Sequence, residues 1–427
     1  MSNRVTSPSF GEAFLFWLRL GFISFGGPTG QIAIMHTELV ERKKWISEER
    51  FLHALNYCML LPGPEAQQLA IYAGWLLHGT PGGVVAGTLF VLPSAILLWA
   101  LTWMYAVYGN VAWISAVFAG LKPAVLAIVA AAVVRIGSKV LKNEVMICLA
   151  GLAFVSIFFF KVPFPIIIGF AALLGLLGER RWKSKFLVLK GHGPEDICRP
   201  SHTHISFGRS SRVLLFGLFL WWTPVVLAGY CLGPNHVLFQ EGVFFSQAAM
   251  VTFGGAYAVL PYVSQQAVEK HAWLSAPQML DGLGLAETTP GPLIMVLQFV
   301  GFLGGWKFHQ PLSPLACATL GAAMTTWTTF VPCFLWIFLG APYIERLRGN
   351  QRLTAALSAI TAAVVGVVLN LAVWLGWKVL FPSGGPTNFF GIVVSSTMLF
   401  GLVKRKWDVI PVVLSAGVLG LAYGVVA

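Results

Sequence analysis

The stretch LLPGPEAQQLA, residues 60–70, places a Pro-Gly-Pro triplet inside a segment that is otherwise apolar enough to cross a membrane. A second copy of the triplet stands in TTPGPLIMVL, residues 288–297. Proline lacks a backbone N–H and clashes with the preceding helical turn, so each triplet predicts a break in its helix. The sequence therefore predicts two apolar helices that are interrupted in the same manner.

The composition indicates a membrane protein. Hydrophobic residues make up 57% of the 427, and charged residues only 10%, whereas soluble domains carry about a quarter charged residues. Apolar runs such as 84–107 and 213–232 match the roughly 20 residues that a helix needs to cross a bilayer. An open sheet could not satisfy its backbone in lipid. We therefore expect an all-α polytopic protein with the lipid bilayer as its surroundings.

The net charge is +12, and a cluster of basic residues lies in one polar linker. That linker contains Arg180, Arg181, Lys183, Lys185, Lys190, Arg199, Arg209 and Arg212, against Glu179, Glu195 and Asp196. Such a loop is typical of the cytoplasmic side of a membrane protein, and we expect no nucleic-acid partner. Anionic lipid headgroups could bind there without specificity.

The cysteines and histidines give little sign of a metal site. The six cysteines are scattered and form no CxxC pair, which is typical of small apolar residues in helices. Cys198, His202 and His204 of the linker have a spacing that could hold a metal. A solvated loop explains them as well, so we expect neither a metal nor a cofactor.

An internal repeat organises the chain. The FGG of residues 25–27 recurs at 253–255, and the triplet of 62–64 recurs at 290–292 with the same offset. Other pairs fall in the same register, including Glu41 with Glu269, Trp45 with Trp273 and Ser47 with Ser275. After a short insertion, Pro93 aligns with Pro332 and Gly109-Asn110 with Gly349-Asn350. The series indicates a duplication.

The duplication predicts two repeats of about six transmembrane segments joined by a linking helix, about 13 spans in total. The domains are residues 1–178, the linker and connecting helix of 179–242, and residues 243–427. The expected spans are 10–36, 51–77, 82–107, 111–134, 145–160, 163–178, 213–232, 243–265, 278–306, 314–341, 353–376, 388–403 and 408–426. Residues 145–178 are short enough to span or to re-enter.

The charged loops predict the orientation. If the linker is cytoplasmic, the loops around Arg135–Lys142, Arg346–Arg352 and Lys404–Lys406 lie inside too, as the positive-inside rule requires. The N-terminus is then cytoplasmic and the C-terminus external. The two repeats have inverted topology, which is an architecture of secondary transporters whose broken helices bind substrate near the midplane.

Broken helix ends suit an anion. They expose unpaired N–H groups and the positive end of the helix dipole, a combination that binds anions without a buried cation. Glycine in FGG lets the backbone approach a ligand closely. The alternative is that the triplets only kink packed helices and the glycines only permit close contact. Two symmetric copies, each paired with FGG, favour the binding site.

These residues resemble the chromate ion transporter family. The similarity lies in FGGPTGQIAIMHTELVERKKW, LPGPEAQQLAIYAGW, FGGAYAVLPYV and TTPGP, and it covers both halves, as in the long two-domain type. The resemblance implies efflux of chromate across the inner membrane and chromate resistance, with sulfate as the natural look-alike. The residues by themselves indicate a duplicated transporter suited to an anion.

The candidate substrate-binding residues lie in or near the interrupted segments. They are Arg19, Gly26, Gly27, Pro62, Gly63, Pro64, Gln68, Lys122, Gly254, Gly255, Thr288, Thr289, Pro290, Gly291 and Pro292. Arg19 would attract the dianion or snorkel to the interface. Lys122 could bind substrate or be a packed, paired lysine. Gln67, Gln68, Thr288 and Thr289 could donate to oxyanion oxygens or serve helix packing.

Two carboxylates beside the triplets are candidates for coupling or charge balance. Glu65 follows the first triplet and Glu287 precedes the second. An ionised carboxylate repels a dianion, so we expect either residue to carry a proton or to neutralise Arg19 or Lys122 when the site is empty.

Two other classes remain open. One is a transporter of sulfate or another anion, with proton-coupled uptake as an option. The other is a membrane-embedded enzyme, which would need paired carboxylates, a Ser/His or Ser/Lys pair or HExxH, none of which we find; we therefore predict that the protein is not an enzyme. The coupling ion and the oligomeric state, with a homodimer as one option, are left undecided.

Overall fold

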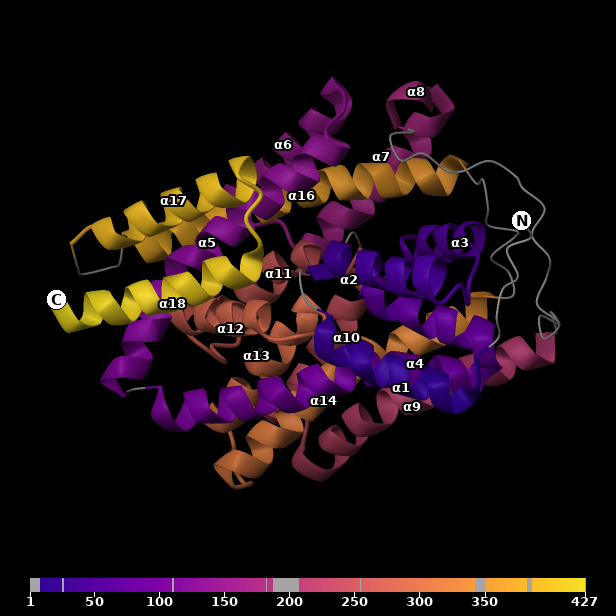
Figure 1. Cartoon of the computed structure of the whole chain (residues 1–427), viewed down its shortest axis with the longest axis horizontal. Coiled ribbons are helices and arrows are strands. Elements are labelled where there is room, and N and C mark those ends of the chain that lie inside the picture. The colour runs from indigo at the N-terminus through magenta and orange to yellow at the C-terminus, as the bar shows by residue number, and fades with distance from the viewer. Residues whose placement is uncertain are drawn as a thin grey trace.

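The computed structural model describes residues 8–24, 27–109, 111–181, 183–186, 207–253, 255–341, 351–381 and 386–426. Throughout these ranges the regular elements are helices, with no strand (Figure 1). Five of the helices are long and apolar enough to cross a membrane. They are α4 (Glu65–Tyr108), α5 (Ala112–Val140), α9 (Phe207–Leu232), α14 (Pro314–Gly340) and α16 (Gln351–Leu380). The fold is therefore that of a multi-pass helical membrane protein.

The remaining elements are shorter. In the first half they are α1 (Phe10–Ile23), α2 (Gly27–His36), η1 (Thr37–Arg42), α3 (Glu48–Cys58), α6 (Glu144–Phe158), α7 (Phe164–Arg181) and α8 (Lys183–Phe186). In the second half they are α10 (Val237–Val251), α11 (Ala256–Gln265), η2 (Gln266–Lys270), α12 (Ala276–Thr288), η3 (Leu293–Met295), α13 (Val296–Lys307), α17 (Phe389–Lys404) and α18 (Val409–Val426). Both η1 and η2 are π-helical turns.

The expected first span of each half is not one helix. Residues 10–36 divide into α1 and α2, and residues 243–265 divide into α10 and α11. The chain turns at Gly27 and Gly255, which have φ angles of +67° and +91°. These backbone conformations are open to glycine and strained for other residues. The prediction of a continuous helix through FGG was therefore wrong, because the glycines end one helix and begin another.

Each Pro-Gly-Pro triplet separates two helices. α3 ends at Cys58 and α4 begins at Glu65, while α12 ends at Thr288 and the helical chain resumes at Leu293. Downstream, the expected spans 51–77 and 82–107 meet inside α4, which is kinked at His78 and Gly79. The broken helix and the kink together divide a long apolar run into segments that point in different directions.

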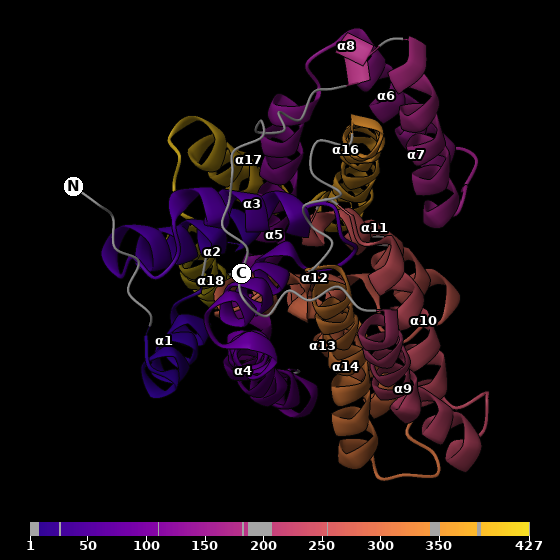
Figure 2. The same ribbon diagram turned by 90° about the vertical axis from the view of Figure 1, so that its right-hand side faces the viewer.

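The two halves are interwoven. α6 and α7 of the first half pack on α16 of the second half, whereas α17 and α18 of the second half pack on α5 of the first. α1 packs on α4, and α10 packs on α14. Figure 2 shows the result, with α1 and α4 on one side and α9, α10 and α14 on the other. Each half therefore completes the helical packing of the other.

The linking helix and the short helix pair lie at the periphery. α9 packs on α10 and α14 but leaves large apolar side chains such as Phe216 and Phe219 exposed, as a lipid-facing helix does. α6 has 15 residues, a length of about 22 Å that falls short of the roughly 30 Å hydrocarbon core. α1 begins at the right of Figure 1 and α18 ends at its left, so these two points lie at opposite ends of the long axis.

Candidate functional site

Two backbone hydrogen bonds join the interrupted segments of the two halves. The N–H of Gly63 donates to the carbonyl of Thr252 at 2.8 Å, and the N–H of Gly291 donates to the carbonyl of Ser24 at 2.7 Å. Ser24 and Thr252 immediately precede the two FGG segments. The triplet of each half is thus bonded to the FGG turn of the other half. We call this pair of reciprocal bonds the crossing.

The two glycines of the crossing also pack closely against the opposite half. Gly63 and Gly291 have φ angles of +121° and +106°. A Cβ at Gly63 would lie 2.8 Å from the sulfur of Cys333, and a Cβ at Gly291 would lie 2.5 Å from the Cβ of Ser94. Ser94 and Cys333 each follow a proline within the long helix of the opposite half. Both the backbone conformation and the space at the crossing therefore require glycine.

The helices that begin at the crossing lack side-chain caps. No side chain caps α4 after Pro64, α11 after Gly255 or η3 after Pro292. Six helices that begin elsewhere are capped by a side chain, namely α1 by Ser9, α3 by Ser47, α6 by Asn143, α12 by Ser275, α14 by Ser313 and α17 by Asn388. α5 and the π-helical turns η1 and η2 are uncapped as well.

Uncapped helix starts carry unpaired N–H groups and the positive end of the dipole. At the crossing these groups come from both halves, and α2 begins there as well at Gly27. The arrangement favours an anion over a cation. Gly26 and Gly254, which the sequence also indicated, lie outside the described residues.

The crossing is braced by an amide that the sequence analysis missed. Gln31 is buried, and its Nε2 donates to the carbonyl of Gly291 at 2.6 Å and to that of Ser24 at 3.3 Å. Its counterpart in the second half is Val259, so no such brace exists there. The only signal in the sequence was a glutamine close to FGG, which is too common a pattern to single out.

Three of the polar side chains that the sequence indicated donate hydrogen bonds to nearby backbone carbonyls. Gln68 Nε2 donates to the carbonyl of Pro62 at 2.8 Å. The Thr288 hydroxyl donates to the carbonyl of Leu285 at 2.8 Å, and that of Thr289 to the carbonyl of Ala286 at 3.2 Å. The geometry favours a structural role for all three, because their donors are already used.

Other buried polar groups near these segments have no partner. Both amide atoms of Gln67 and the hydroxyls of Ser94 and Thr329 are without hydrogen bonds, and each residue is buried. Gln67 lines a cavity of about 620 Å³ between α4 and the α13–α14 pair. Buried polar groups are normally hydrogen-bonded, so these are the groups with unused capacity for a ligand. The Pro93–Pro332 alignment was the available signal for Ser94.

The two coupling candidates lie at the crossing but have different surroundings. Glu287 accepts a hydrogen bond from the Tyr257 hydroxyl at 2.6 Å. Glu65 starts α4, is partly buried, and has neither a hydrogen bond nor an ion pair within the described part of the chain. Neither carboxylate contacts Arg19 or Lys122, so the expectation that they neutralise those cations in the empty site is not met by this structure.

Lys122 has a different partner. Its Nζ lies 3.6 Å from Asp281 Oδ1 of α12, and the Tyr105 hydroxyl donates to Asp281 Oδ2 at 2.8 Å. Asp281 is buried. The three residues connect α4 and α5 of the first half with α12 of the second. The geometry favours the interpretation of Lys122 as a paired lysine, and Asp281 was missed because its partner is distant in sequence.

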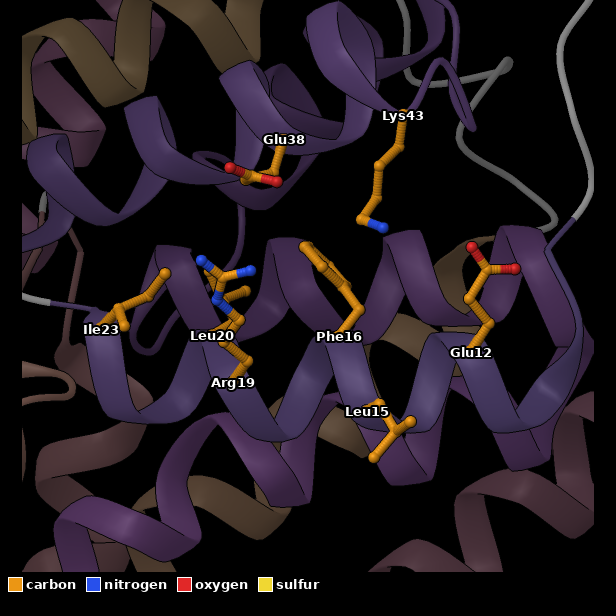
Figure 3. A pocket seen from close by; sticks show the side chains of 8 residues that line it. All are labelled: Glu12, Leu15, Phe16, Arg19, Leu20, Ile23, Glu38 and Lys43. Carbon is orange, nitrogen blue, oxygen red and sulfur yellow. The ribbon is translucent and has the colours of Figure 1, made fainter.

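Arg19 lies on the outer side of α1 and is exposed, rather than facing the interior as a buried substrate ligand would. Figure 3 shows its guanidinium pointing toward Glu38 across a cavity of about 210 Å³. Lys43 and Ile23 also line this cavity. Ile23 directly precedes Ser24, so one end of the cavity adjoins the crossing. The linker residues Cys198, His202 and His204 lie outside the described residues.

The apolar helices and the polar crossing between them define a multi-pass membrane protein built from interrupted helices. The chain belongs to the chromate transporter family, whose model matches residues 11–176 and 239–421. This membership places the chain among transporters.

Similar proteins align over most of the chain. A chromate transport protein of Pseudomonas aeruginosa is 30% identical over 420 residues, covering 96% of this chain and 92% of that protein. A probable chromate transport protein of Synechococcus elongatus is 29% identical, covering 88% and 87%. A chromate transport protein of Cupriavidus metallidurans is 28% identical, covering 91% and 87%. No solved structure matches the chain.

Proposed function

We propose that this protein is a secondary transporter that exports chromate across the inner membrane and thereby gives chromate resistance. The observation that carries the proposal is the crossing, where uncapped helix starts from both halves meet around glycine backbone. The names of the relatives supply the substrate. Chromate is a tetrahedral dianion, and its oxygens suit convergent N–H donors.

The anion is held by backbone N–H groups at the starts of α2, α4 and α11, with donors added by Gln67 and Ser94. Their unused hydrogen-bonding capacity supports this assignment. Arg19 and Lys43 concentrate anions in the cavity that adjoins the crossing, because cationic surfaces raise the local concentration of anions. Glu287, fixed by Tyr257, organises the site without touching the ionised substrate.

The membrane potential can drive export. Moving one charge through 100 mV is worth about 2.3 kcal/mol, so a dianion leaving a negative interior gains roughly 4.6 kcal/mol. At about 1.4 kcal/mol per tenfold, this supports an outward gradient on the order of a thousandfold. The sequence contains no GxxxxGK[ST] phosphate loop, which agrees with a transporter that does not use ATP.

The test is transport by the purified protein in liposomes under an imposed potential. Labelled chromate should move toward the positive side without ATP, and protein-free liposomes should show no such movement. Sulfate, tested in parallel, decides between the two tetrahedral dianions. Movement of sulfate in the opposite direction, driven by protons and insensitive to potential, would replace chromate export with sulfate uptake.

We further propose that the two halves, residues 1–178 and 243–427, are inverted repeats joined by residues 179–242. The matching order of α1, α2, η1 and α3 with α10, α11, η2 and α12 supports the repeat. The start of α1 and the end of α18 lie at opposite ends of the long axis, which agrees with termini on opposite sides of the membrane, and the basic linker assigns the cytoplasmic side to the N-terminus. Reporter fusions after Trp182 and after Ala427 should report opposite compartments; the same compartment for both would contradict the inversion.

A further inference from the structure

One carboxylate of the second half is buried without any partner. Glu241 of α10 is 0% exposed, and neither of its carboxylate oxygens has a hydrogen bond. It also forms no ion pair among the described residues. An ionised carboxylate in such surroundings is costly unless it is paired. Its counterpart in the first half is Ala13, so the repeat does not require an acid at this position.

Two glycines make room for this carboxylate. A Cβ at Gly304 of α13 would clash with Glu241 Oε1, and a Cβ at Gly321 of α14 would lie 2.9 Å from Oε2. A Cβ at Gly321 would also approach the Gly301 carbonyl at less than the normal contact distance. α13 and α14 therefore pack backbone against backbone where the carboxylate enters, as small residues allow in membrane helices. The acid therefore occupies the interface between these two helices, which we call the seam.

Few titratable groups face Glu241. From α14 the facing group is the thiol of Cys317. Trp273 packs against Gly304 and stacks on the ring of His271 at 4.4 Å between centroids, so His271 lies one ring further away. On α13 the nearest cation in sequence, Lys307, donates to the carbonyl of Ala272 at 2.7 Å. α9 presents the apolar Val225 to the neighbouring Gly242.

We propose that Glu241 is a proton-binding site of the transport cycle, which takes up one proton to become a carboxylic acid and releases it when α13 and α14 separate. A proton suits the site better than a metal cation, because metal ions need several free oxygen ligands, and the backbone oxygens near the carboxylate, such as that of Gly301, belong to helix interiors, where carbonyls already accept a backbone hydrogen bond. The inference rests on the proposed transport function. Under that function the proton enters as the dianion leaves, and both movements run down an inside-negative potential.

The first experiment measures both fluxes in liposomes that contain a pH-sensitive dye. For the wild type, chromate movement should be accompanied by a change in lumenal pH. Glu241→Gln keeps the shape of the protonated acid, so it should retain exchange of labelled for unlabelled chromate. The accompanying proton flux should fall by about tenfold or more, within the range of coupled sites. Glu144→Gln, at the exposed start of α6, is the matched control and should alter neither flux.

The outcomes separate this inference from the proposed function. A wild-type protein that moves no anion overturns the transporter proposal. Anion movement without proton flux, or proton flux unchanged in Glu241→Gln, overturns the proton site alone. Anion movement that follows a sodium gradient instead also overturns it.

The second experiment uses only the wild-type protein, so it does not require that a variant folds correctly. Dicyclohexylcarbodiimide adds to protonated carboxyls in apolar surroundings, and peptide mapping of the wild-type protein locates the adduct. Glu241 should be modified, more slowly as the pH rises, and the exposed Glu144 should remain unmodified. An unmodified Glu241, or labelling independent of pH, contradicts the proposal.

Discussion

The two halves of the molecule have matching backbone conformations at several corresponding positions, but their side chains differ. Gly63 and Gly291 make equivalent hydrogen bonds with equivalent φ angles. The π-helical turns η1 and η2 also correspond, and Lys44 and Ala272 that follow them share a positive φ. Several polar and charged residues near the interrupted segments, by contrast, differ between the halves.

Four positions illustrate the difference. Arg19, Gln67 and Lys122 of the first half correspond to Gln247, Met295 and Ala362 of the second, while Glu241 of the second corresponds to Ala13. A backbone site can be made twice because its geometry depends on a few glycines and prolines. Side chains are free to differ between the halves wherever that backbone geometry does not depend on them. The comparison teaches that the crossing is common to both halves, whereas the charged and amide side chains around it belong to one half or the other.

The largest expected effect comes from breaking the crossing. Gly63→Ala and Gly291→Ala each place a Cβ at a positive φ, which costs about 1–2 kcal/mol, and force it into a close contact, which costs about 1–3 kcal/mol more. Chromate transport should fall about a hundredfold, because small displacements at a site cost on that order. Gly151→Ala, on α6 with open space around it, is the control. Full activity in both crossing variants would show that transport does not depend on the crossing.

The second-largest effect on transport is expected for substitution of Glu287, the carboxylate beside the second triplet. Glu287→Gln should lower the transport rate about tenfold, because the charge-assisted hydrogen bond from Tyr257 is replaced by a weaker neutral one. The dependence of the rate on membrane potential should not change, since Glu287 organises the site and carries no charge across the membrane. Initial rates at a series of imposed potentials measure both quantities. A flattened voltage dependence would instead make Glu287 a carrier of charge.

The neighbouring residues Gln67 and Gln68 allow a structural role and a binding role to be compared directly. Gln68→Met loses the bond to the partly buried Pro62 carbonyl, and a lost hydrogen bond costs about 0.5–1.5 kcal/mol, so the protein should unfold at a lower temperature. Gln67→Met reproduces the second half, and its amide has no protein partner to lose. This variant should keep its stability and raise the KM for chromate several-fold. Equal effects of the two substitutions on KM would remove Gln67 from the site.

The smallest effect is expected at the exposed cation. Arg19→Gln also reproduces the second half, and it should lower transport about two- to threefold, since exposed charges are weakly coupled in water. The loss should disappear at high ionic strength, where the attraction of anions to the cavity is screened. Rates measured over a range of salt concentrations test this. A large loss that persists in high salt would return Arg19 to direct contact with the substrate.

Much of the fold was predictable from local rules. The triplets at 62–64 and 290–292 predicted interrupted helices because proline cannot continue a helix, and helix ends are found there. FGG was harder to interpret, because glycine is also common in continuous membrane helices. Its role as a turn became clear only from the positive φ of Gly27 and Gly255.

The candidate site was predictable in its backbone and much less so in its side chains. Gln68 and Thr288 were reasonable donors by residue type, yet both donate to nearby carbonyls. Whether a side chain has a free donor depends on the neighbours that the fold supplies. For the same reason the sequence could not single out Gln31 or Ser94.

The sequence by itself determined that this chain is a helical membrane protein and that its helices break at the two Pro-Gly-Pro triplets, because composition and proline act locally. Only the tertiary structure decided that each triplet bonds to the turn of the opposite half, that Lys122 pairs with Asp281, and that Glu241 is left without a partner. Those contacts join residues far apart in the chain, and no local rule specifies which distant groups meet.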